Sequence, residues 1–404
     1  AASAAAAAIG AASAAAAAIG AASAQRSEPS KPPSIGILGT GWGLRVQVPE
    51  FRSAGLVVSA IYSRDAARAA SIAETHGIDH GCDSVDSLCA LTDVDIVSCV
   101  GPTSTRCEHT LTALRYGKHV LVDKPMALNE GEALVMLQAA RASKVQAWMD
   151  FELRCTPAVV KLRELLSSGE LGSPLHASFR CVANFGFLAG KHSHWATREQ
   201  GGGVFSAVGT HFVDLTRHVT GCEVARVSAT QRPLVATLPH PSSGAPMVVT
   251  SDGLCMATLE MVQPTRDGDT ANAASSMPLP VSIFISGLSP GLPFQNTLTL
   301  CCERGSATLN LLDATLSVHR TDAPGQTEVY GGGGNAWSEV GTPALGRALV
   351  AALKGGQGPA EAGGIHPRDL ATLEDGLIVQ RVTDAVHESA RRGGVWMFVD
   401  REVP

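Results

Sequence analysis

Short apolar runs alternate with amphipathic segments between residues 34 and 150. The run that ends at Leu38 is followed by further runs over 56–62, 95–100, 119–122 and 145–149, and glycine, serine or aspartate follows each of them. Segments with helical periodicity separate these runs, the longest of them from about Asn129 to Ala142. The alternation predicts a parallel, doubly wound α/β sheet with right-handed crossovers. Ligands of such sheets gather at the carboxyl ends of the strands.

The pattern changes after residue 150, where strand-like runs follow one another with few helices between them. Such an order predicts an α+β region with one large, mostly antiparallel sheet. We therefore expect a low-complexity disordered tail and linker over 1–33, a dinucleotide-binding Rossmann domain over 34–150 and a substrate-binding and dimerisation domain over 151–404. The expected strands are 175–183, 224–229, 248–262, 280–285, 297–302 and 306–311, the helices 158–166, 343–353 and 369–391, and the surface loops 239–246, 263–278 and 331–341.

The N-terminal segment is a repeat without charge. Residues 1–10 recur unchanged as 11–20, and a third copy begins at Ala21. Alanine is only weakly apolar, and the run lacks the basic start and leucine-rich centre of a signal peptide, so we expect a disordered or transiently helical tail rather than a membrane span. The chain does not begin with methionine, so the true N-terminus and organellar targeting stay open.

Composition narrows the class of partner. The 404 residues carry 37 acidic and 31 basic side chains, so the balance gives no sign of a nucleic-acid or anionic membrane surface. None of the ten cysteines forms a C-x-x-C pair, which favours reduced thiols in an intracellular, cytoplasmic protein. We therefore expect a small-molecule substrate as partner. One face of the antiparallel sheet is left to cover, so we also expect a homo-oligomer, a dimer or higher, formed through that sheet.

A glycine-rich turn follows the first apolar run. Gly39 permits a tight turn, and Gly41 lets the backbone approach a phosphate at the start of the next helix. The third small residue of G-x-G-x-x-G/A falls on Leu44, which should push the helix off the sheet unless Gly43 relieves the packing. The turn predicts a dinucleotide pyrophosphate site; the alternative is an ordinary strand–turn–helix corner.

The second predicted strand ends in Ser63, Arg64 and Asp65. NAD-binding folds usually place an acid at this strand end, where it holds the ribose 2′-hydroxyl. A small hydroxyl beside a guanidinium suits a 2′-phosphate better, so we expect NADP in preference to NAD. The alternative is that Ser63 and Asp65 only cap the following helix. Two more predicted strand ends, Gly101-Pro102 and Asp123-Lys124-Pro125, meet at the same edge and strengthen the cofactor interpretation.

Five motifs in order resemble the glucose–fructose oxidoreductase/inositol dehydrogenase family, written Gfo/Idh/MocA. The resemblance runs from about Ser34 to Val399, and Pro102–Arg106 resembles the subgroup of "glucose–fructose oxidoreductase domain-containing" proteins. Asp123 replaces the glutamate of the family's G-K-H-V-x-x-E-K-P motif. The motifs are Gly39–Gly43, Gly117–Pro125, Arg154–Pro157, Gly201–Asp214 and the C-terminal stretch that includes Glu374–Leu377 and Asp384–Ala390.

The resemblance implies an NAD(P)-dependent oxidoreductase that moves a hydride between nicotinamide and a CH–OH or carbonyl group of a sugar, polyol or related compound. A base must then remove the hydroxyl proton. The implied catalytic residues are Lys124 and His211. The residues expected to bind the cofactor are Gly39, Thr40, Gly41, Trp42, Gly43, Ser63, Arg64, Gly101, Pro102, Arg106, Asp123, Lys124 and Arg154.

The family's aspartate is missing, because Ala207 stands four residues before His211. Three outcomes stay open. Either Lys124 and His211 are sufficient for catalysis, or another acid such as Asp150, Glu152 or Asp214 assists them, or catalysis is lost while nucleotide binding persists. We expect Asp214 to be the structural partner of a basic residue. The functions left open are the oxidoreductase, a non-catalytic nucleotide-binding protein and a redox-assisted glycoside hydrolase.

A histidine–tryptophan segment precedes the glycine run. We expect His194 and Trp195 to lie on a flexible loop over the substrate, since an indole beside an imidazole suits a sugar or an aromatic ring. The alternative is that Trp195 only anchors the loop. His192, His194 and His211 would make a weak metal site with no nearby cysteine or carboxylate, so we expect no metal.

Overall fold

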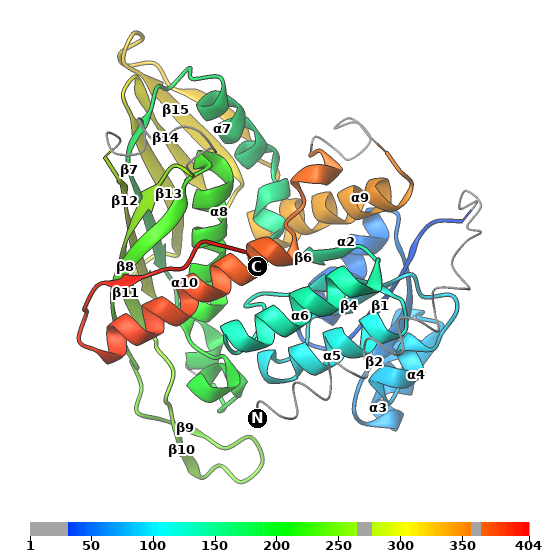
Figure 1. Ribbon diagram of the computed structural model, residues 1–404. Coiled ribbons are helices and arrows are strands. Elements are labelled where there is room, and N and C mark those ends of the chain that lie inside the picture. The colour runs from blue at the N-terminus through cyan, green and yellow to red at the C-terminus, as the bar shows by residue number, and fades with distance from the viewer. Residues whose placement is uncertain (1–30, 189, 265–276, 357–364, 404) are drawn as a thin grey trace. The chain divides into compact units, whose positions relative to one another are not determined.

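The computed structural model describes residues 31–188, 190–264, 277–356 and 365–403. Residues 1–30 of the predicted tail and most of the predicted loop 263–278 lie outside these ranges. The chain divides into two compact units (Figure 1). The first runs to Glu152 and includes Gly341–Leu377, and the second comprises Leu153–Val340 and Ile378–Pro404. The sequence analysis assigned 341–377 to the C-terminal region, whereas its contacts join it to the first unit.

The first unit contains a six-stranded parallel sheet with the order β3-β2-β1-β4-β5-β6. This is the predicted doubly wound arrangement, in which the strand order reverses between β1 and β4. Its central strands are buried on both faces, which explains their continuous apolar runs. The strands are β1 (Ser34–Ile37), β2 (Val57–Tyr62), β3 (His80–Cys82), β4 (Ile96–Cys99), β5 (His119–Val122) and β6 (Ala147–Met149).

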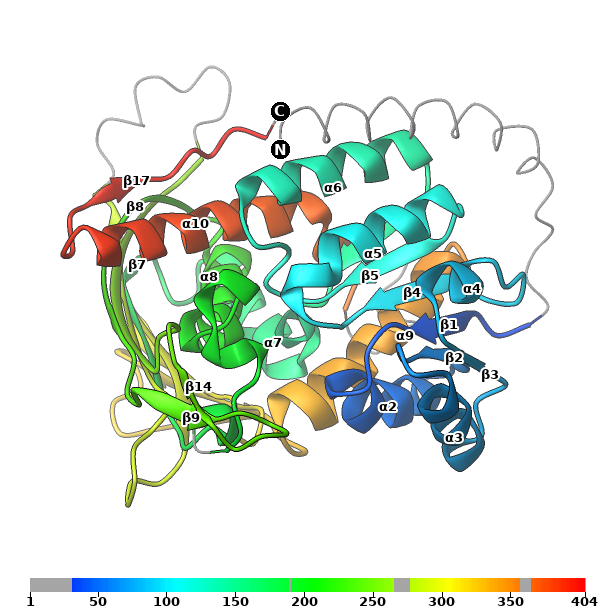
Figure 2. The same cartoon turned by 90° about the horizontal axis from the view of Figure 1, so that it is seen from below.

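Helices cover both faces of this sheet (Figure 2). Asp65 caps α3 and Asn129 caps α6, each by accepting a hydrogen bond from a backbone N–H in the first turn. A π-helical turn, Gly43–Gln47, leads into α2. The helices are α2 (Val48–Ser53), α3 (Ala66–His76), α4 (Val85–Cys89), α5 (Thr103–Arg115), α6 (Glu130–Ser143), α9 (Thr342–Leu353) and the first turn of α10 (Leu373–Arg391).

The second unit contains a nine-stranded sheet with the order β16-β15-β14-β13-β7-β12-β11-β8-β17. All its pairs are antiparallel except β7 with β12, so the sheet is mixed. Buried and half-exposed residues alternate along β13, as expected of a sheet with one face in the core. The strands are β7 (Pro174–Val182), β8 (Glu223–Arg232), β11 (Leu254–Val262), β12 (Leu279–Ser286), β13 (Gln295–Cys302), β14 (Gly305–Asn310), β15 (Thr315–Arg320), β16 (Glu328–Gly331) and β17 (Met397–Phe398).

Three helical elements pack on the inner face of this sheet, namely α7 (Pro157–Ser167), α8 (Thr210–Thr220) and the part of α10 that belongs to this unit (Figure 1). Phe179 of β7 and Phe212 of α8 stack with ring centroids 4.3 Å apart. The Ser389 hydroxyl of α10 accepts a hydrogen bond from the Ala229 N–H at 2.9 Å. The first contact holds α8, the helix that carries His211, on the sheet, and the second holds α10 against β8.

Two predictions for this unit were wrong in detail. The expected strand 248–262 is interrupted, because Val248 belongs to a small hairpin of β9 (Thr237–Pro239) and β10 (Pro246–Val248), while β11 begins at Leu254. The expected loop 331–341 ends in a π-helical turn, Ala336–Gly341. Over the residues that the structure describes, no helix is both long and apolar enough to cross a membrane.

Candidate functional site

The glycine-rich turn after β1 packs against the loop that follows β4. A Cβ added to Gly39 would lie 3.0 Å from the Val100 carbonyl, and one added to Gly101 would lie 3.0 Å from the Leu38 oxygen. Glycine at both positions lets the two backbones approach this closely without displacing either of them. A Cβ on Gly41 would meet nothing within 4 Å, so the backbone of Gly41 faces open space. The turn therefore offers the surface without side chains that a phosphate group needs at a helix N-terminus.

Gly43 takes the packing role of the third small residue. A Cβ at Gly43 would lie 2.7 Å from Cγ2 of Ile37 and 2.8 Å from Cγ1 of Val100. The helix approaches the sheet through this glycine, while Leu44 stays half-buried. Leu44 therefore does not hold the helix away from the sheet. The helix begins as a π-helical turn, and its last residue, Gln47, is completely buried.

The three residues that follow β2, Ser63 to Asp65, differ in their contacts. Asp65 accepts a hydrogen bond from the Arg68 N–H at 2.8 Å and so caps α3, as the alternative interpretation expected. Ser63 is half-buried, its N–H donates to the Cys82 oxygen at 3.0 Å, and Arg64 is exposed. The Arg68 guanidinium donates to Oγ1 of Thr40 at 3.4 Å. Sequence analysis missed Arg68, which lies in the first turn of α3.

Arg106 of α5 holds the strand ends together. Its buried guanidinium donates to the carbonyl oxygens of Cys99 (3.3 Å), Gly101 (2.8 Å) and Pro125, to Oγ1 of Thr103 and to the carboxylate of Asp123, the last at 3.1 Å. These bonds account for the five N–H groups of an arginine. The geometry favours a supporting role for Arg106, and its direct contact with a cofactor stays a prediction.

A buried polar chain begins at β4 and ends at the carboxyl end of β6. The Ser98 hydroxyl donates to Oε1 of Gln47 at 2.7 Å, and Nε2 of Gln47 donates to Oδ2 of Asp150 at 2.8 Å. Asp150 and Glu152 are each only 2% exposed. Sequence analysis named the two acids as alternatives but missed Gln47, which the π-helical turn directs inward.

Burial raises the pKa values of both acids. For Asp150, desolvation is the main cause and the charge of Asp123 adds to it, while the hydrogen bond from Gln47 and the charge of Lys124 oppose it, which leaves the pKa at about 7. For Glu152, desolvation is again the main cause, followed by the charge of Asp150, and Lys124 acts against both. The half-buried Lys124 thus lies beside two carboxyl groups that resist ionisation.

The second unit carries His211 on α8. His211 is 1% exposed, and Trp337 contacts its ring edge-on, with centroids 4.3 Å apart. Sequence analysis missed Trp337 because its segment was expected to be a surface loop. A π-helical turn, Phe205–Gly209, precedes α8 and contains the half-buried Ala207.

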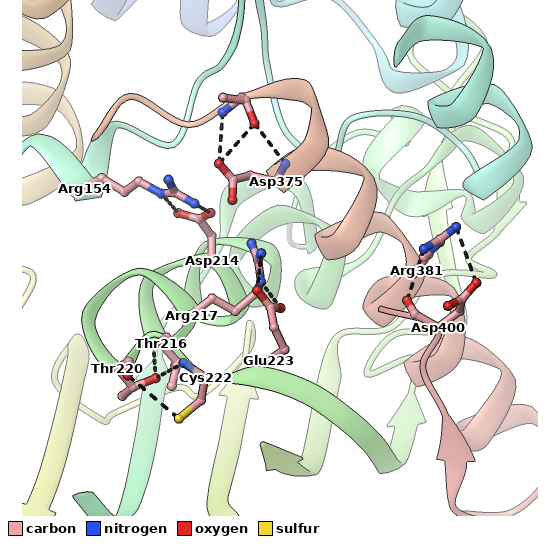
Figure 3. Close-up of polar contacts among 11 residues, drawn as sticks. Arg154, Asp214, Thr216, Arg217, Thr220, Cys222, Glu223, Asp375, Arg381 and Asp400 are labelled. Carbon is pink, nitrogen blue, oxygen red and sulfur yellow. Dashed lines mark hydrogen bonds and ion pairs between the residues drawn. The ribbon is translucent and has the colours of Figure 1, made fainter. Parts of the chain in front are cut away.

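Arg154 and Asp214 form a buried ion pair in the same unit (Figure 3). Nε and Nη2 of Arg154 donate to the two carboxylate oxygens at 2.8 and 2.5 Å, and the side chains are 7% and 2% exposed. Asp214 is therefore the structural partner of a basic residue, as expected. A contact between Arg154 and a cofactor stays a prediction.

The glycine run fixes the segment with His194 and Trp195. A Cβ on Gly202 would lie 2.4 Å from the Trp195 oxygen, and that oxygen also accepts from the Gly203 N–H at 3.1 Å and the Ser251 hydroxyl at 2.7 Å. The half-buried Trp195 is thus anchored through its backbone. A contact of either ring with substrate stays a prediction.

Asp252 links Arg198 to the π-helical turn that precedes α8. The buried Asp252 accepts from the Phe205 N–H at 3.0 Å and from the Arg198 guanidinium at 3.2 Å. Arg198 also contacts Nδ1 of His387 at 2.6 Å. Burial, and then the charge of Arg198, lowers the pKa of His387 to about 3, so this imidazole is neutral. Among the described residues, no three histidines, cysteines or acids are grouped to hold a metal ion.

An open glycine turn at the switch point of a doubly wound sheet, with a lysine after the neighbouring strand β5, is typical of a dinucleotide-binding domain. Comparison of the sequence with known families then identifies the chain. Its residues 34–151 match the description "Oxidoreductase family, NAD-binding Rossmann fold", and its residues 159–308 match "GFO/IDH/MocA C-terminal domain". The chain belongs to the GFO/IDH/MocA family of oxidoreductases, as the sequence motifs indicated.

Two sequence relatives and one solved structure illustrate the similarity. The chain is 28% identical over 381 residues to human glucose-fructose oxidoreductase domain-containing protein 2, a match that covers 91% of this chain and 94% of that protein. It is 30% identical over 190 residues to the uncharacterized oxidoreductase sll0816 of Synechocystis, which covers 46% of this chain and only 51% of that protein. A levoglucosan dehydrogenase, solved in complex with NADH and levoglucosan, has a similar fold with a TM-score of 0.76 at 19% identity, over 92% of this chain and 100% of that one.

Proposed function

We propose that the protein is an NADP(H)-preferring oxidoreductase that transfers a hydride between nicotinamide and a CH–OH or carbonyl group of a small polyol, sugar or related compound. The observation that carries this proposal is the open backbone at Gly41, in the turn after β1, at the same edge of the sheet at which Lys124 follows β5. The levoglucosan dehydrogenase, whose substrate is an anhydrosugar, supports a polyhydroxylated substrate by analogy of fold.

The chain's own residues divide the task. The turn Gly39–Gly43 would hold the pyrophosphate through backbone N–H groups and the positive end of the helix. Bound nicotinamide would accept or donate the hydride. Lys124 would bind the substrate hydroxyl and stabilise the negative charge that develops on its oxygen. His211 is the second candidate for proton transfer, although Ala207 offers it no carboxylate.

The preference for NADP rests on the end of β2. An acid there would repel a 2′-phosphate, whereas Ser63 offers a hydroxyl donor and Arg64 a fork of N–H groups. Arg68, which reaches Thr40, adds a second positive charge on the same unit. Ser63, the residue that follows β2, is thus not an acid that would repel a 2′-phosphate bound beside the glycine-rich turn.

Titration with NADPH and NADH, followed by nicotinamide fluorescence, tests the cofactor assignment. Arg64→Ala should weaken NADPH by about tenfold or more, the worth of one charge-assisted hydrogen bond, and leave NADH within about twofold. Arg401→Ala removes the same charge from an exposed position of the second unit and should change neither. Equal affinity of the wild type for both cofactors would remove the NADP preference.

Activity tests the role of Lys124. A panel of sugars and cyclitols is screened for the reduced nicotinamide band, and Lys124→Ala should lower kcat by about a hundredfold or more. Lys354→Ala is the matched control, since Lys354 is an exposed lysine of the same unit. Unchanged kcat in Lys124→Ala would exclude the lysine from the chemistry.

Ala207 favours a second candidate, a nucleotide-binding protein without catalysis. Tight cofactor binding with no turnover over the whole panel would select it. A redox-assisted glycoside hydrolase is the third, and it would retain its cofactor and cleave glycosides without net release of NADPH.

We also propose that two copies pair through the sheet of the second unit. On its face opposite α7 and α8, Met256, 45% exposed, lies between Phe284 of β12 and Thr230 of β8, and the ion pair of Arg226 with Glu260 lies on the same face. Met256→Glu should turn a dimer into a monomer in light scattering. A cytoplasmic location stays a prediction for cell imaging.

A further inference from the structure

A run of four glycines precedes the π-helical turn Ala336–Gly341. Gly331 to Gly334 all have positive φ values, between 79° and 124°, a backbone region that residues with a side chain rarely adopt. A Cβ at Gly331 would lie 2.5 Å from the Ala314 oxygen, and one at Gly334 would overlap the Glu339 carboxylate. The path of the chain into this turn therefore depends on glycine at these positions.

Hydrogen bonds then hold the backbone of Trp337, the second residue of the turn. The Ala336 N–H donates to the oxygen of Leu311, in the connection between β14 and β15, at 3.1 Å. The Trp337 N–H donates to Oδ1 of Asn335 at 3.0 Å, and the Asn335 N–H donates to Oε2 of Glu339 at 2.7 Å. The indole therefore extends from a backbone that its neighbours keep in place.

The indole of Trp337 lies against His211. The ring centroids are 4.3 Å apart and the ring planes make an angle of 83°, so the imidazole covers at most one face of the indole. The imidazole is 1% exposed, whereas Trp337 is half-buried. A substrate group therefore reaches the imidazole only when a neighbouring side chain moves, and Trp337 is a neighbour with exposed surface. A hydroxyl bonded to His211 would bring the carbon atom that carries it close to this indole.

We propose that Trp337 determines substrate specificity at His211 by offering an apolar surface on which the C–H face of a ring-shaped polyol, a sugar or a cyclitol, stacks. A six-membered ring carries C–H groups on its faces, and these pack well on an aromatic ring. An open-chain polyol with the same hydroxyl groups has no such face. The inference rests on the proposed function and narrows its substrate class to ring-shaped compounds.

The contact with His211 is tested first, by NMR of the protein with ¹³C-labelled histidine. The ring current of the indole should shift the ring protons of His211 out of the usual imidazole range, and His211→Gln identifies these signals by their loss. Trp337→Met should return them to the usual range, whereas Trp396→Phe, at an exposed tryptophan of the same unit, should leave them shifted. His211 signals that are the same in the wild type and in Trp337→Met would overturn the contact and the proposal with it.

Kinetics test the specificity with matched pairs of compounds. myo-Inositol and sorbitol each carry six hydroxyl groups, the first on a ring and the second on an open chain, and each ring compound of the panel that reacts is paired in this way. Trp337→Met should raise KM for the ring compound by about fivefold or more, with kcat within about threefold. The open-chain partner, measured as substrate or as competitive inhibitor, should stay within about twofold in the same variant. Trp337→Phe keeps an aromatic face and should bring KM for the ring compound back to within about twofold of the wild type.

The two hypotheses fail in different ways. A wild type that binds NADPH and reacts with no compound of the panel refutes the proposed function. An equal change for both members of a pair in Trp337→Met, no change for the ring compound, or reaction with open-chain polyols alone refutes only the role of Trp337. Circular dichroism identifies a variant that fails to fold, and Trp337→Leu then takes the place of Trp337→Met in both experiments.

Discussion

Alanine substitutions at two glycines of one turn should have opposite effects, one on protein stability and the other on cofactor binding. Gly41 has open space around its missing Cβ and lies outside the left-handed backbone region, so Gly41→Ala should fold normally. Gly43 has Ile37 and Val100 side-chain carbons at 2.7 and 2.8 Å from that position. Gly43→Ala therefore overpacks the helix against β1, which costs about 1–3 kcal/mol of the free energy of unfolding.

The effects on cofactor binding reverse this order. A methyl group on Gly41 would stand between a phosphate and the backbone N–H groups, and loss of one hydrogen bond to a charged group is worth about 1.5–3 kcal/mol. At about 1.4 kcal/mol per factor of ten, Gly41→Ala should weaken NADPH by about 10- to 100-fold. Gly43→Ala, once folded, should bind within about threefold of the wild type.

Two measurements on each variant decide the matter. Urea denaturation gives the free energy of unfolding, and nicotinamide fluorescence gives the dissociation constant of NADPH. If Gly41→Ala retained wild-type affinity, the open surface at this turn would not be the phosphate site. If Gly43→Ala were as stable as the wild type, the close packing of this helix on the sheet would be refuted.

Three further changes should alter stability. Asp214→Asn leaves Arg154 buried without its counter-charge, so the free energy of unfolding should fall by about 3–5 kcal/mol in urea, while Asp322→Asn, at an exposed position of the same unit, should be neutral. His387 has a pKa of about 3 in the folded protein and about 6.5 in the unfolded chain, so the unfolded chain takes up the proton first as the pH falls. The free energy of unfolding should therefore decrease between these two pKa values, by at most about 1.4 kcal/mol per pH unit. His387→Gln should remove this pH dependence, and an unchanged pH dependence would refute the burial of His387. The pKa of Asp150 is raised to about 7, so the folded state keeps a proton that the unfolded chain releases, and the free energy of unfolding falls as the pH rises from about 4 to 7. Asp150→Asn should remove this decrease in urea titrations at several pH values. An unaltered decrease in the variant would contradict the raised pKa.

The sequence predicted the strands whose apolar runs are long enough to be buried on their own. The expected strand 119–122 is β5 itself, and 297–302 lies within β13. β3 has three residues, one of them glycine, and α4 has five residues, so neither provides enough positions for a period to show. β15 has only two apolar residues, Leu316 and Val318, and its pairing with β14 and β16 comes from tertiary structure.

The site was predictable where it follows strand ends, and not where it depends on distant contacts. The positions of Gly41, Ser63 and Lys124 follow from the topology of a parallel sheet. The bond from Gln47 to Asp150 joins residues 103 positions apart in the sequence. It also depends on a π-helical turn, whose period differs from the 3.6 residues that sequence patterns assume. The contact between Trp337 and His211 is likewise set by tertiary packing.

The geometry of the site depends on the number of residues in the π-helical turn Gly43–Gln47. Each residue of an α-helix advances the direction of its side chains by about 100°. Deletion of one residue within this turn would regularise the helix and turn Gly43 by about 100° relative to Gln47, so Gly43 could keep its packing on β1 only if Gln47 moved away from Asp150. Homologues that lack the extra residue should therefore need a different donor for the acid after β6, and insertions or deletions here should be inherited together with changes at positions 47 and 150.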